Sequence, residues 1–412
     1  MKNTKIYAEV LEQSALDQFE AAMALECNIQ GALMPDAHTG YTLPIGAVIK
    51  SSGTVFPSYV GYDIGCGMCA IKVNIHKEEL NLETLKESIL KRIPIGFNRH
   101  NTPKVIPDKI HEMKMTSFTR GHLDNIGTIQ IGTLGGGNHF IEIGEADFDS
   151  EIDSSGETWI VIHSGSRGLG HKIADHYMKL AATDSLDTVE MEHEFFMSHQ
   201  SLFEHNKPRY DIEIERYYEK EKLKLAKDVE GHYGFDITSK NGSDYLNDME
   251  VGLEFALANR KAMIENILEA IFEQTGERTT GCLINRNHNH AEVSEDGFVI
   301  HRKGATHADD GMLGVIPGNM LDGSFIVSGL GNPESMNSSS HGAGRVLSRK
   351  KARETLSVET FNSDMENVVT NHSVDTIDES PQAYKNIFEV MKLQKDLVEV
   401  VDRCRPFLNI KG

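Results

Sequence analysis

The sequence predicts an α+β fold in a single domain that spans residues 1–412. Short β-favouring runs separated by glycine turns occupy residues 1–75, and the same character returns after residue 280. Residues 171–275 differ, because they are charged, nearly free of proline and helical in periodicity over 216–230 and 251–275. No internal repeat or low-complexity linker marks a domain boundary. We therefore expect residues 171–275 to form a helical layer on the flank of the same core.

Individual elements follow from local patterns. Residues 47–49 and 54–56 are β-favouring, and the Ser-Ser-Gly sequence at 51–53 between them predicts a turn. Residues 78–91 place five apolar side chains near one face, which predicts an amphipathic helix. Residues 127–145 and 157–163 are typical of buried strands that end in glycine-rich loops. For Trp159 and the run 194–197 we favour core packing over base stacking.

Composition limits the function classes. Lys+Arg is 41 and Asp+Glu is 62, a net charge of −21, which argues against a protein that coats nucleic acid non-specifically but does not exclude a local basic site. No apolar run is long enough for a membrane helix, and the N-terminus lacks the apolar core of a signal peptide. Five cysteines are sparse and odd in number, which favours a reducing cytosol over a disulfide framework. We expect a cytoplasmic protein.

Five of the 19 histidines lie in glycine-rich or polar segments of unusual composition. Glycine permits positive φ and close approach to a ligand, and successive backbone N–H groups can cradle an anion. A single such histidine is more often an ordinary polar residue near a turn. The set together predicts a site; its segments are GGGNH at 135–139, HSGSRG at 163–168, NRNHNH at 285–290 and SHGAGR at 340–345.

The segment DIGCGMC at 63–69 supplies a carboxylate and a thiol three residues apart. A zinc ribbon needs a second cysteine pair, and a redox Cys-x-x-Cys usually opens a helix after a strand. The glycines and Asp63 favour a ligand loop instead, with Cys66 as the ligand and Cys69 as a small buried strand residue. Carboxylate, thiolate and imidazole together suit Mn, Fe or Zn, and a pair of ions often orients phosphoryl displacements. This chemistry alone covers hydrolases, transferases and ligases.

The segments MPDAH, DIGCGM, GGGNHFIE, HSGSRG, HRKGA and SHGAGR occur in this order over residues 34–345. In this order they resemble the RtcB family of GTP-dependent RNA ligases, and the closing Lys411-Gly412 is similar to the end of that family. The resemblance implies a β-rich core in layers ringed by helices, with a dinuclear metal site in a central cleft. It also implies an enzyme that joins an RNA 3′-phosphate or 2′,3′-cyclic phosphate to a 5′-hydroxyl, using GTP and Mn²⁺.

The resemblance implies a set of metal ligands. Asp63 and Cys66 match the ligand loop, with the Cys66 thiolate bridging two Mn²⁺ ions; His139 and His163 match ligands of one ion and His288 that of the other. Where many members have Cys-His-His before the third histidine, this chain has Arg-Asn-His at 286–288. A second imidazole two residues on, at position 290, is therefore a rival ligand.

The resemblance also implies the catalytic pair. His341 matches the nucleophile that attacks the α-phosphate of GTP and forms a His–GMP phosphoramidate, and Asp36 matches a carboxylate that fixes the ring orientation. An imidazole of unperturbed pKa about 6.5 is largely neutral at pH 7, whereas an unperturbed lysine is protonated. Histidine is thus a suitable nucleophile.

The remaining implied contacts are to the nucleotide and the RNA. Glu142 matches a residue that accepts from the guanine edge, and Lys411 one near the base. Further nucleotide contacts are implied at Asn138, Ser324, Gly342, Ala343 and Gly344, and at Asn319, where the family often has serine. Planar guanidinium groups suit phosphates, which implies GTP or RNA contacts for Arg167, Arg345 and Arg349; for Arg349 surface salt bridging is an equal alternative.

Two other functions stay open at this stage. One is an end-capping or repair nucleotidyltransferase that acts on damaged RNA or DNA 3′-phosphates, and activity on matched RNA and DNA ends would separate it from a ligase. The other is a metal-dependent phosphohydrolase, which would give His341 and Glu142 no role. A non-enzymatic nucleotide-binding module is disfavoured because binding alone requires no such convergence of ligands. The sequence does not indicate the physiological RNA, the oligomeric state or whether an archease-like activator is a partner.

Overall fold

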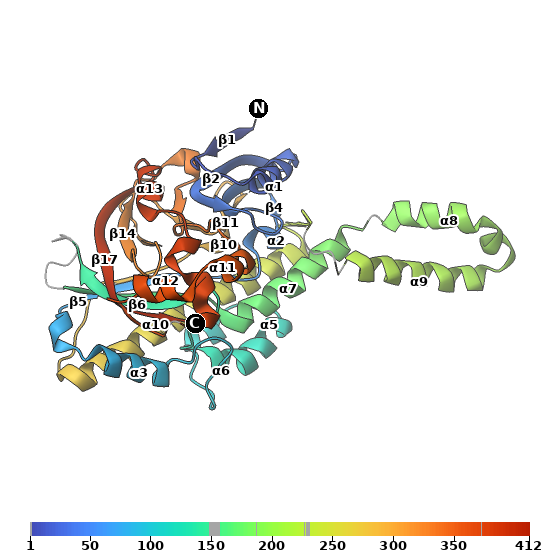
Figure 1. Cartoon of the computed structure of the whole chain (residues 1–412). Helices are drawn as coiled ribbons and strands as arrows, with labels where there is room; N and C mark the ends of the chain where they lie inside the picture. Colours follow the sequence, from blue (N-terminus) through green and yellow to red (C-terminus); the bar gives the residue numbers. More distant parts are fainter. Residues whose placement is uncertain (1, 148–156, 187, 226, 228–230, 372) are drawn as a thin grey trace.

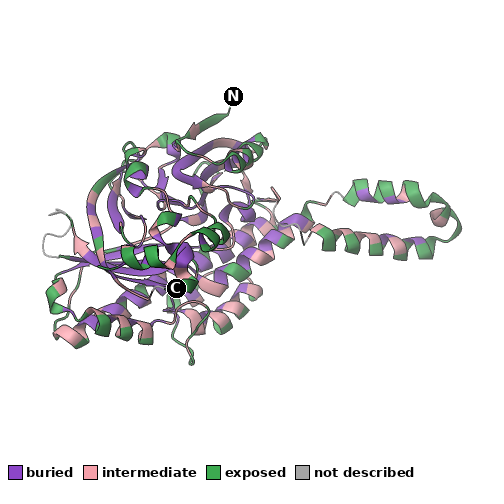
Figure 2. Cartoon of the chain, in the orientation of Figure 1, coloured by how far each residue is buried: buried purple, intermediate pink, exposed green. Residues whose placement is uncertain are grey.

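The computed structural model describes residues 2–147, 157–186, 188–225, 227, 231–371 and 373–412. It is an α+β chain in which two sheets lie together and helices cover their outer surfaces (Figure 1). The α+β prediction is therefore confirmed. Buried residues concentrate in the strands and in the helix faces turned toward them (Figure 2).

The larger sheet is antiparallel along its whole path. Strand β17 is the C-terminal segment and lies between β14 and β6, and the short strand β16 (Val369–Thr370) pairs with it in parallel. In spatial order the sheet contains β13 (Leu313–Pro317), β14 (Ser324–Gly329), β17 (Val398–Lys411), β6 (Phe140–Ala146), β7 (Thr158–Ser164), β5 (Gly67–Val73) and β9 (Leu283–Asn287).

The smaller sheet meets the larger one where the chain passes from β9 directly into β10, with one residue, His288, between the two strands. Its order is β1 (Asn3–Ile6), β2 (Asn28–His38), β3 (Ile45–Ser52), β11 (Phe298–Lys303) and β10 (Asn289–Val293). Two short ribbons complete the described strands: β12 (Ala305–His307) with β15 (Ser338–Ser340), and β4 (Thr54–Val55) with β8 (Phe235–Asp236).

Helix α10 (Lys240–Thr275) is the longest element, and its 36 residues extend for about 54 Å. The Ser239 hydroxyl caps its first turn by accepting from the backbone N–H of Gly242, and Gly276 ends it at φ 73°, where a side chain would be strained. It packs against β5, β7 and β9 of the larger sheet. The other helices are α1 (Gln13–Ala24), α2 (Pro57–Val60), α3 (Leu82–Arg92), α4 (Asp108–His111), α5 (Ser117–His122), α6 (Thr128–Gln130), α7 (Arg167–Asp184), α8 (Thr188–His205), α9 (Lys207–Leu225), α11 (Arg349–Thr355), α12 (Val358–Asp364) and α13 (Ile387–Lys392).

The expected helical layer over 171–275 is wrong in one respect. Helices α7 and α10 pack on the core, but α8 and α9 form an antiparallel hairpin that projects away from it (Figure 1). This arm carries its own apolar cluster around Phe195, Tyr210 and Ile214. Amphipathic periodicity indicates that a helix has an apolar face but not what packs against it. In this arm the apolar faces of α8 and α9 pack against each other.

Two local predictions also shift. The helix expected over 78–91 begins at Leu82, because the Asn81 side chain accepts the Thr84 N–H at 3.0 Å and caps it there. Within 127–145 only β6 is a strand; a helical turn at 128–130 and a glycine loop precede it. The turn at 51–53 is confirmed, with Gly53 at φ 65°, and Trp159 is buried in the core at 1% exposure. In the described part of the chain, no helix combines the length and apolarity of a membrane span.

Candidate active site

Four segments far apart in the sequence bring their polar side chains to the seam between the two sheets. Cys66 precedes β5, His139 precedes β6, His163 lies near the end of β7, and His288 joins β9 to β10. The Cys66 Sγ lies 3.4 Å from His139 Nε2 and 3.1 Å from His163 Nε2. Asp63 Oδ2 lies 3.2 Å from His139 Nε2. The structure thus brings the five predicted metal-ligating residues into one cluster.

Backbone carbonyls fix the orientation of two of these rings. His139 Nδ1 lies 3.0 Å from the Leu134 oxygen, and His163 Nδ1 lies 3.1 Å from the Asn138 oxygen. A carbonyl only accepts, so each Nδ1 donates to it and each Nε2 is turned toward Cys66. Histidine ligands of metals are held by this same arrangement.

His288 and His290 face different surroundings. His288 Nε2 lies 3.3 Å from His163 Nε2, so this ring belongs to the cluster. The His290 Nε2 instead lies 3.4 Å from a guanidinium N–H of Arg302, which also pairs with Glu292 at 2.7 Å. The position of His288 at the crossing between the sheets explains why it, and not His290, reaches the other ligands.

The cluster fits a metal ion by its donor chemistry. Burial, reinforced by neighbouring imidazoles, holds the pKa values of His163 and His288 well below the usual range, so both rings are neutral. Nitrogen atoms of His139 and His163 then converge on the Cys66 thiol, and the neutral His288 ring lies against His163. Burial raises the pKa of the Cys66 thiol, and a bound cation would favour its thiolate form. Thiolate, imidazole and carboxylate together suit Mn, Fe or Zn.

His341 lies beside this cluster, its ring centroid 4.8 Å from that of His288. It directly follows β15, and its Nδ1 lies 2.7 Å from Oδ2 of the fully buried Asp36 on β2. The same oxygen accepts the backbone N–H groups of His341 and Gly342 at 3.2 and 3.3 Å. Asp36 therefore holds the proton on Nδ1 and leaves Nε2 with its lone pair.

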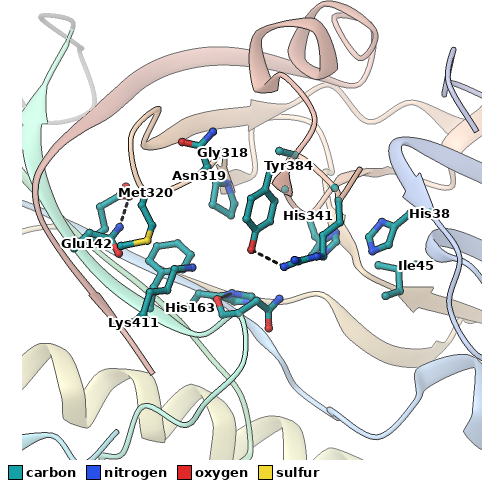
Figure 3. Close-up of a pocket in the computed structure, with 18 of the residues that line it drawn as sticks. His38, Ile45, Glu142, His163, Gly318, Asn319, Met320, His341, Tyr384 and Lys411 are labelled. Carbon is teal, nitrogen blue, oxygen red and sulfur yellow. Dashed lines mark hydrogen bonds between the residues drawn. The ribbon is translucent and has the colours of Figure 1, made fainter. Parts of the chain in front are cut away.

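A cavity of about 270 Å³ connects His341 with a second polar end. Figure 3 shows His341 and His38 at one end, Glu142 and Lys411 at the other, and His163 between them. The cavity wall includes most of the predicted nucleotide contacts: Asn138, Glu142, Asn319, Gly342, Ala343, Gly344, Arg345, Arg349 and Lys411.

Glu142 is 1% exposed, and burial raises its pKa to about 7. Its Oε1 accepts from the Ser324 hydroxyl at 2.8 Å and its Oε2 from the Asn409 amide at 3.1 Å. Ser324 does not line the cavity, so its place is behind Glu142, where it orients the carboxyl group. Asn319 lines the cavity, but its side chain is engaged in a local turn with Asp322.

The arginines expected at phosphates are paired within the protein. Arg345 and Arg349 both contact Glu379, at 3.1 and 2.6 Å, and Arg349 also contacts Asp378 at 2.7 Å. Lys411 Nζ reaches the second oxygen of Glu379 at 2.9 Å. Burial would raise the pKa of Glu379, but Lys411 and Arg349 lower it to about 2. Arg345, Arg349 and Lys411 thus share the carboxylates of Glu379 and Asp378 at this wall of the cavity.

Arg167 lies apart from the cavity wall. Its guanidinium donates to the Thr133 hydroxyl at 3.0 Å and to the Gly96 carbonyl at 2.9 Å. It therefore braces the glycine loop before His139. Sequence reasoning also missed cavity residues that carry no glycine signal, namely His38, Phe140, Pro317, Met320, Tyr384 and Asn409.

Comparison with known proteins gives consistent findings. A family model described as tRNA-splicing ligase RtcB matches residues 18–123 and 108–412. The RNA-splicing ligase RtcB of Escherichia coli strain K12 is 35% identical over 407 residues, which covers 92% of this chain and 90% of that protein. The tRNA-splicing ligases RtcB of Nanoarchaeum equitans and Aeropyrum pernix are 28% and 27% identical, each covering 92% of this chain and 87% of their own length.

Proposed function

Because the chain belongs to the tRNA-splicing ligase RtcB family, we propose that it is an RNA ligase that joins a 3′-phosphate or 2′,3′-cyclic phosphate end to a 5′-hydroxyl end, using GTP and Mn²⁺. The observation that carries the proposal is the Asp36–His341 pair at one end of a cavity whose other end holds Glu142. A phosphohydrolase would need neither of these groups.

In the first step, His341 Nε2 attacks the α-phosphorus of GTP. A nitrogen–phosphorus bond forms, the bond from that phosphorus to the bridging oxygen breaks, and pyrophosphate leaves with the electron pair. The ring becomes positively charged during the attack, and the Asp36 carboxylate at 2.7 Å stabilises that charge through Nδ1–H. GMP is then held covalently on His341.

The cavity orients the nucleotide for this attack. The Glu142 carboxylate accepts the N–H groups of the guanine edge, and Lys411 lies beside it over the Phe140 ring at 5.0 Å. Asn138, Arg345 and Arg349 line the same cavity and would contact the phosphates. The backbone of Gly342 and Gly344 lets the nucleotide come close to the nucleophile.

The metal site would supply charge neutralisation and orientation of the reacting oxygens. Asp63, Cys66, His139, His163 and His288 would hold the Mn²⁺ ions, and Cys66 Sγ lies close to the imidazoles of His139 and His163.

The following steps transfer GMP and join the ends. A 2′,3′-cyclic phosphate is first opened by water to a 3′-phosphate. An oxygen of the 3′-phosphate attacks the GMP phosphorus, the bond to His341 breaks, and an RNA(3′)pp(5′)G end results. The 5′-hydroxyl oxygen then attacks the 3′-phosphorus, loses its proton, and releases GMP.

An intact-mass experiment tests the proposal. The protein is incubated with GTP and Mn²⁺ and scored for an acid-labile GMP adduct, alongside His341→Ala. His290→Asn is the matched control, because this buried histidine contacts Arg302 and not the cavity. We expect the adduct in the native protein and the control and none in His341→Ala. A metal-loaded native protein without adduct would contradict the proposal.

Matched RNA and DNA substrates with 3′-phosphate ends then separate ligation from end repair. A ligase converts the RNA pair to a joined product and consumes the 5′-hydroxyl end. An end-capping enzyme stops at the pp(5′)G end, whatever 5′-hydroxyl strand is offered.

A further inference from the structure

Two adjacent, fully buried residues of α10, Asn259 and Arg260, contact the segments that carry the metal-ligating side chains. We propose that they are positioning residues which set the geometry of the metal site and thereby its affinity for the ion. The inference rests on the proposed function for the identity of the ion, Mn²⁺. Neither residue lines the cavity or offers an atom to the cluster, so neither is a catalytic residue.

Asn259 ties the loop before His139 to the end of β7. Its Oδ1 accepts the backbone N–H groups of Gly132 and Thr133 at 2.7 and 3.1 Å. Its Nδ2 donates to the carbonyls of Thr133 and Gly165, both at 3.1 Å. One amide thus fixes the spacing between the segments that supply His139 and His163.

Arg260 ties the other segments together. Its Nη1 donates to the carbonyls of Gly65 and Ser164 at 2.9 and 2.8 Å, so the guanidinium holds the residues that adjoin Cys66 and His163. Its Nε and Nη2 donate to the amide oxygens of Asn285 and Asn287 at 2.7 and 2.6 Å. The second of these directly precedes His288.

The partners of Arg260 in these four hydrogen bonds are all uncharged. A fully buried cation is costly unless its donors are satisfied, and the planar fork satisfies them here with the backbone and amides of the ligand segments. Lysine would keep the charge but has a single nitrogen, which cannot reach four acceptors arranged around a plane. The arrangement therefore requires the shape of arginine as well as its charge.

Helix α10 also approaches the ligand loop directly. Gly65 has φ 71°, and a Cβ at this position would lie 2.9 Å from the Ala256 side chain. The loop that carries Asp63 and Cys66 is thus fixed against one turn of the helix, and Asn259 and Arg260 stand on the next turn. Movement of that turn would change the distances between all the ligands together.

The test is the Mn²⁺ affinity of the metal-stripped protein, measured by calorimetry and by the loss of the free-ion electron paramagnetic resonance signal. Outer residues that orient metal ligands typically change affinity by about 10–100-fold. We expect a loss of this size in Arg260→Lys and in Asn259→Asp. The aspartate keeps the acceptor oxygen but places a second carboxylate oxygen against the carbonyls of Thr133 and Gly165. The second variant decides the question if the first does not fold.

Lys72→Met is the matched control. Lys72 is a buried cation in the larger sheet, and its Nζ lies 3.2 Å from Oδ2 of Asp402. It stands near the end of β5 that is far from Cys66. Its loss should lower the melting temperature and leave Mn²⁺ affinity within about twofold of native. If the native protein and both α10 variants bind Mn²⁺ with equal affinity at temperatures below their melting temperatures, the inference is wrong, and the proposed function is not affected. A native protein that binds no Mn²⁺ would contradict the proposed function and this inference with it.

Discussion

Under the proposed function, the buried carboxyl group of Glu142 should make guanine recognition dependent on pH. Burial raises its pKa to about 7, while hydrogen bonds from Ser324 and Asn409 and the charge of Lys411 only partly offset the effect. The guanine edge presents two neighbouring N–H donors, and only the ionised carboxylate can accept from both, because a protonated carboxyl group turns one of its oxygens into a donor. Guanine must therefore bind the protein with Glu142 ionised, and this form is a minority below pH 7.

The size of the effect follows from this pKa. About one Glu142 in eleven is ionised at pH 6, and about ten in eleven at pH 8, so the apparent affinity should fall about tenfold between pH 8 and pH 6. Guanosine is the suitable probe, because it carries no phosphate that titrates in this range and needs no metal ion. Its dissociation constant is measured by calorimetry at both pH values, with adenosine as the comparison.

Glu142→Gln is the matched variant. The glutamine has the same size and cannot ionise, so its weaker binding of guanosine should be equal at pH 6 and pH 8. A native protein that binds guanosine equally well at both pH values would refute the reasoning, as would a Glu142→Gln variant that keeps the full tenfold dependence.

Four other outcomes are expected. Asp36→Asn removes a charge-assisted hydrogen bond worth about 1.5–3 kcal/mol and should slow GMP-adduct formation about 10–100-fold in a quenched time course. Glu142→Gln should become relatively more stable than native as pH rises from 4.5 to about 7, by at most about 3 kcal/mol in urea unfolding, because a raised folded-state pKa stabilises the protonated form at low pH. Phe195→Ala should cost the arm about 3 kcal/mol in hydrogen exchange and leave adduct formation unchanged. Chelation should remove about 2.7 kcal/mol of the stability seen with Mn²⁺ at 100 times its dissociation constant, measured as a fall in melting temperature.

Residue chemistry in the glycine-rich segments predicted a shared site and a ligand loop at Asp63 and Cys66, whereas the full ligand set and the cavity residues came from the resemblance to a family. Spacing could not decide whether His288 or His290 is the metal ligand, because residues two apart lie on the same side of an ideal strand. The structure breaks that alternation by placing His288 between two strands of different sheets. The point at which the chain passes from one sheet to the other depends on long-range strand pairing, which no local pattern of residues predicts.

The arm and the inner residues of α10 show the other limit. Periodicity over 216–230 predicted a helix but not what covers its apolar face, because packing on a neighbouring helix and packing on a sheet select the same spacing. Asn259 and Arg260 stand in a mostly apolar stretch of α10, which was the available signal for a buried polar pair. Their partners lie from 25 to 195 residues away and depend on the complete fold.

The joining of distant segments at the sheet seam has a consequence for synthesis of the chain. Asn289 Nδ2 donates to the Asp63 carbonyl at 3.1 Å, a contact that spans 226 residues. A chain emerging from the ribosome presents Cys66, His139 and His163 long before His288, and the nucleophile at 341 later still. Cys66, His139 and His163 are thus synthesised before α10 and before His288, which completes the proposed site. The proposed metal site can therefore close only after translation has passed β10, because His288 takes its position when β9 pairs with β5.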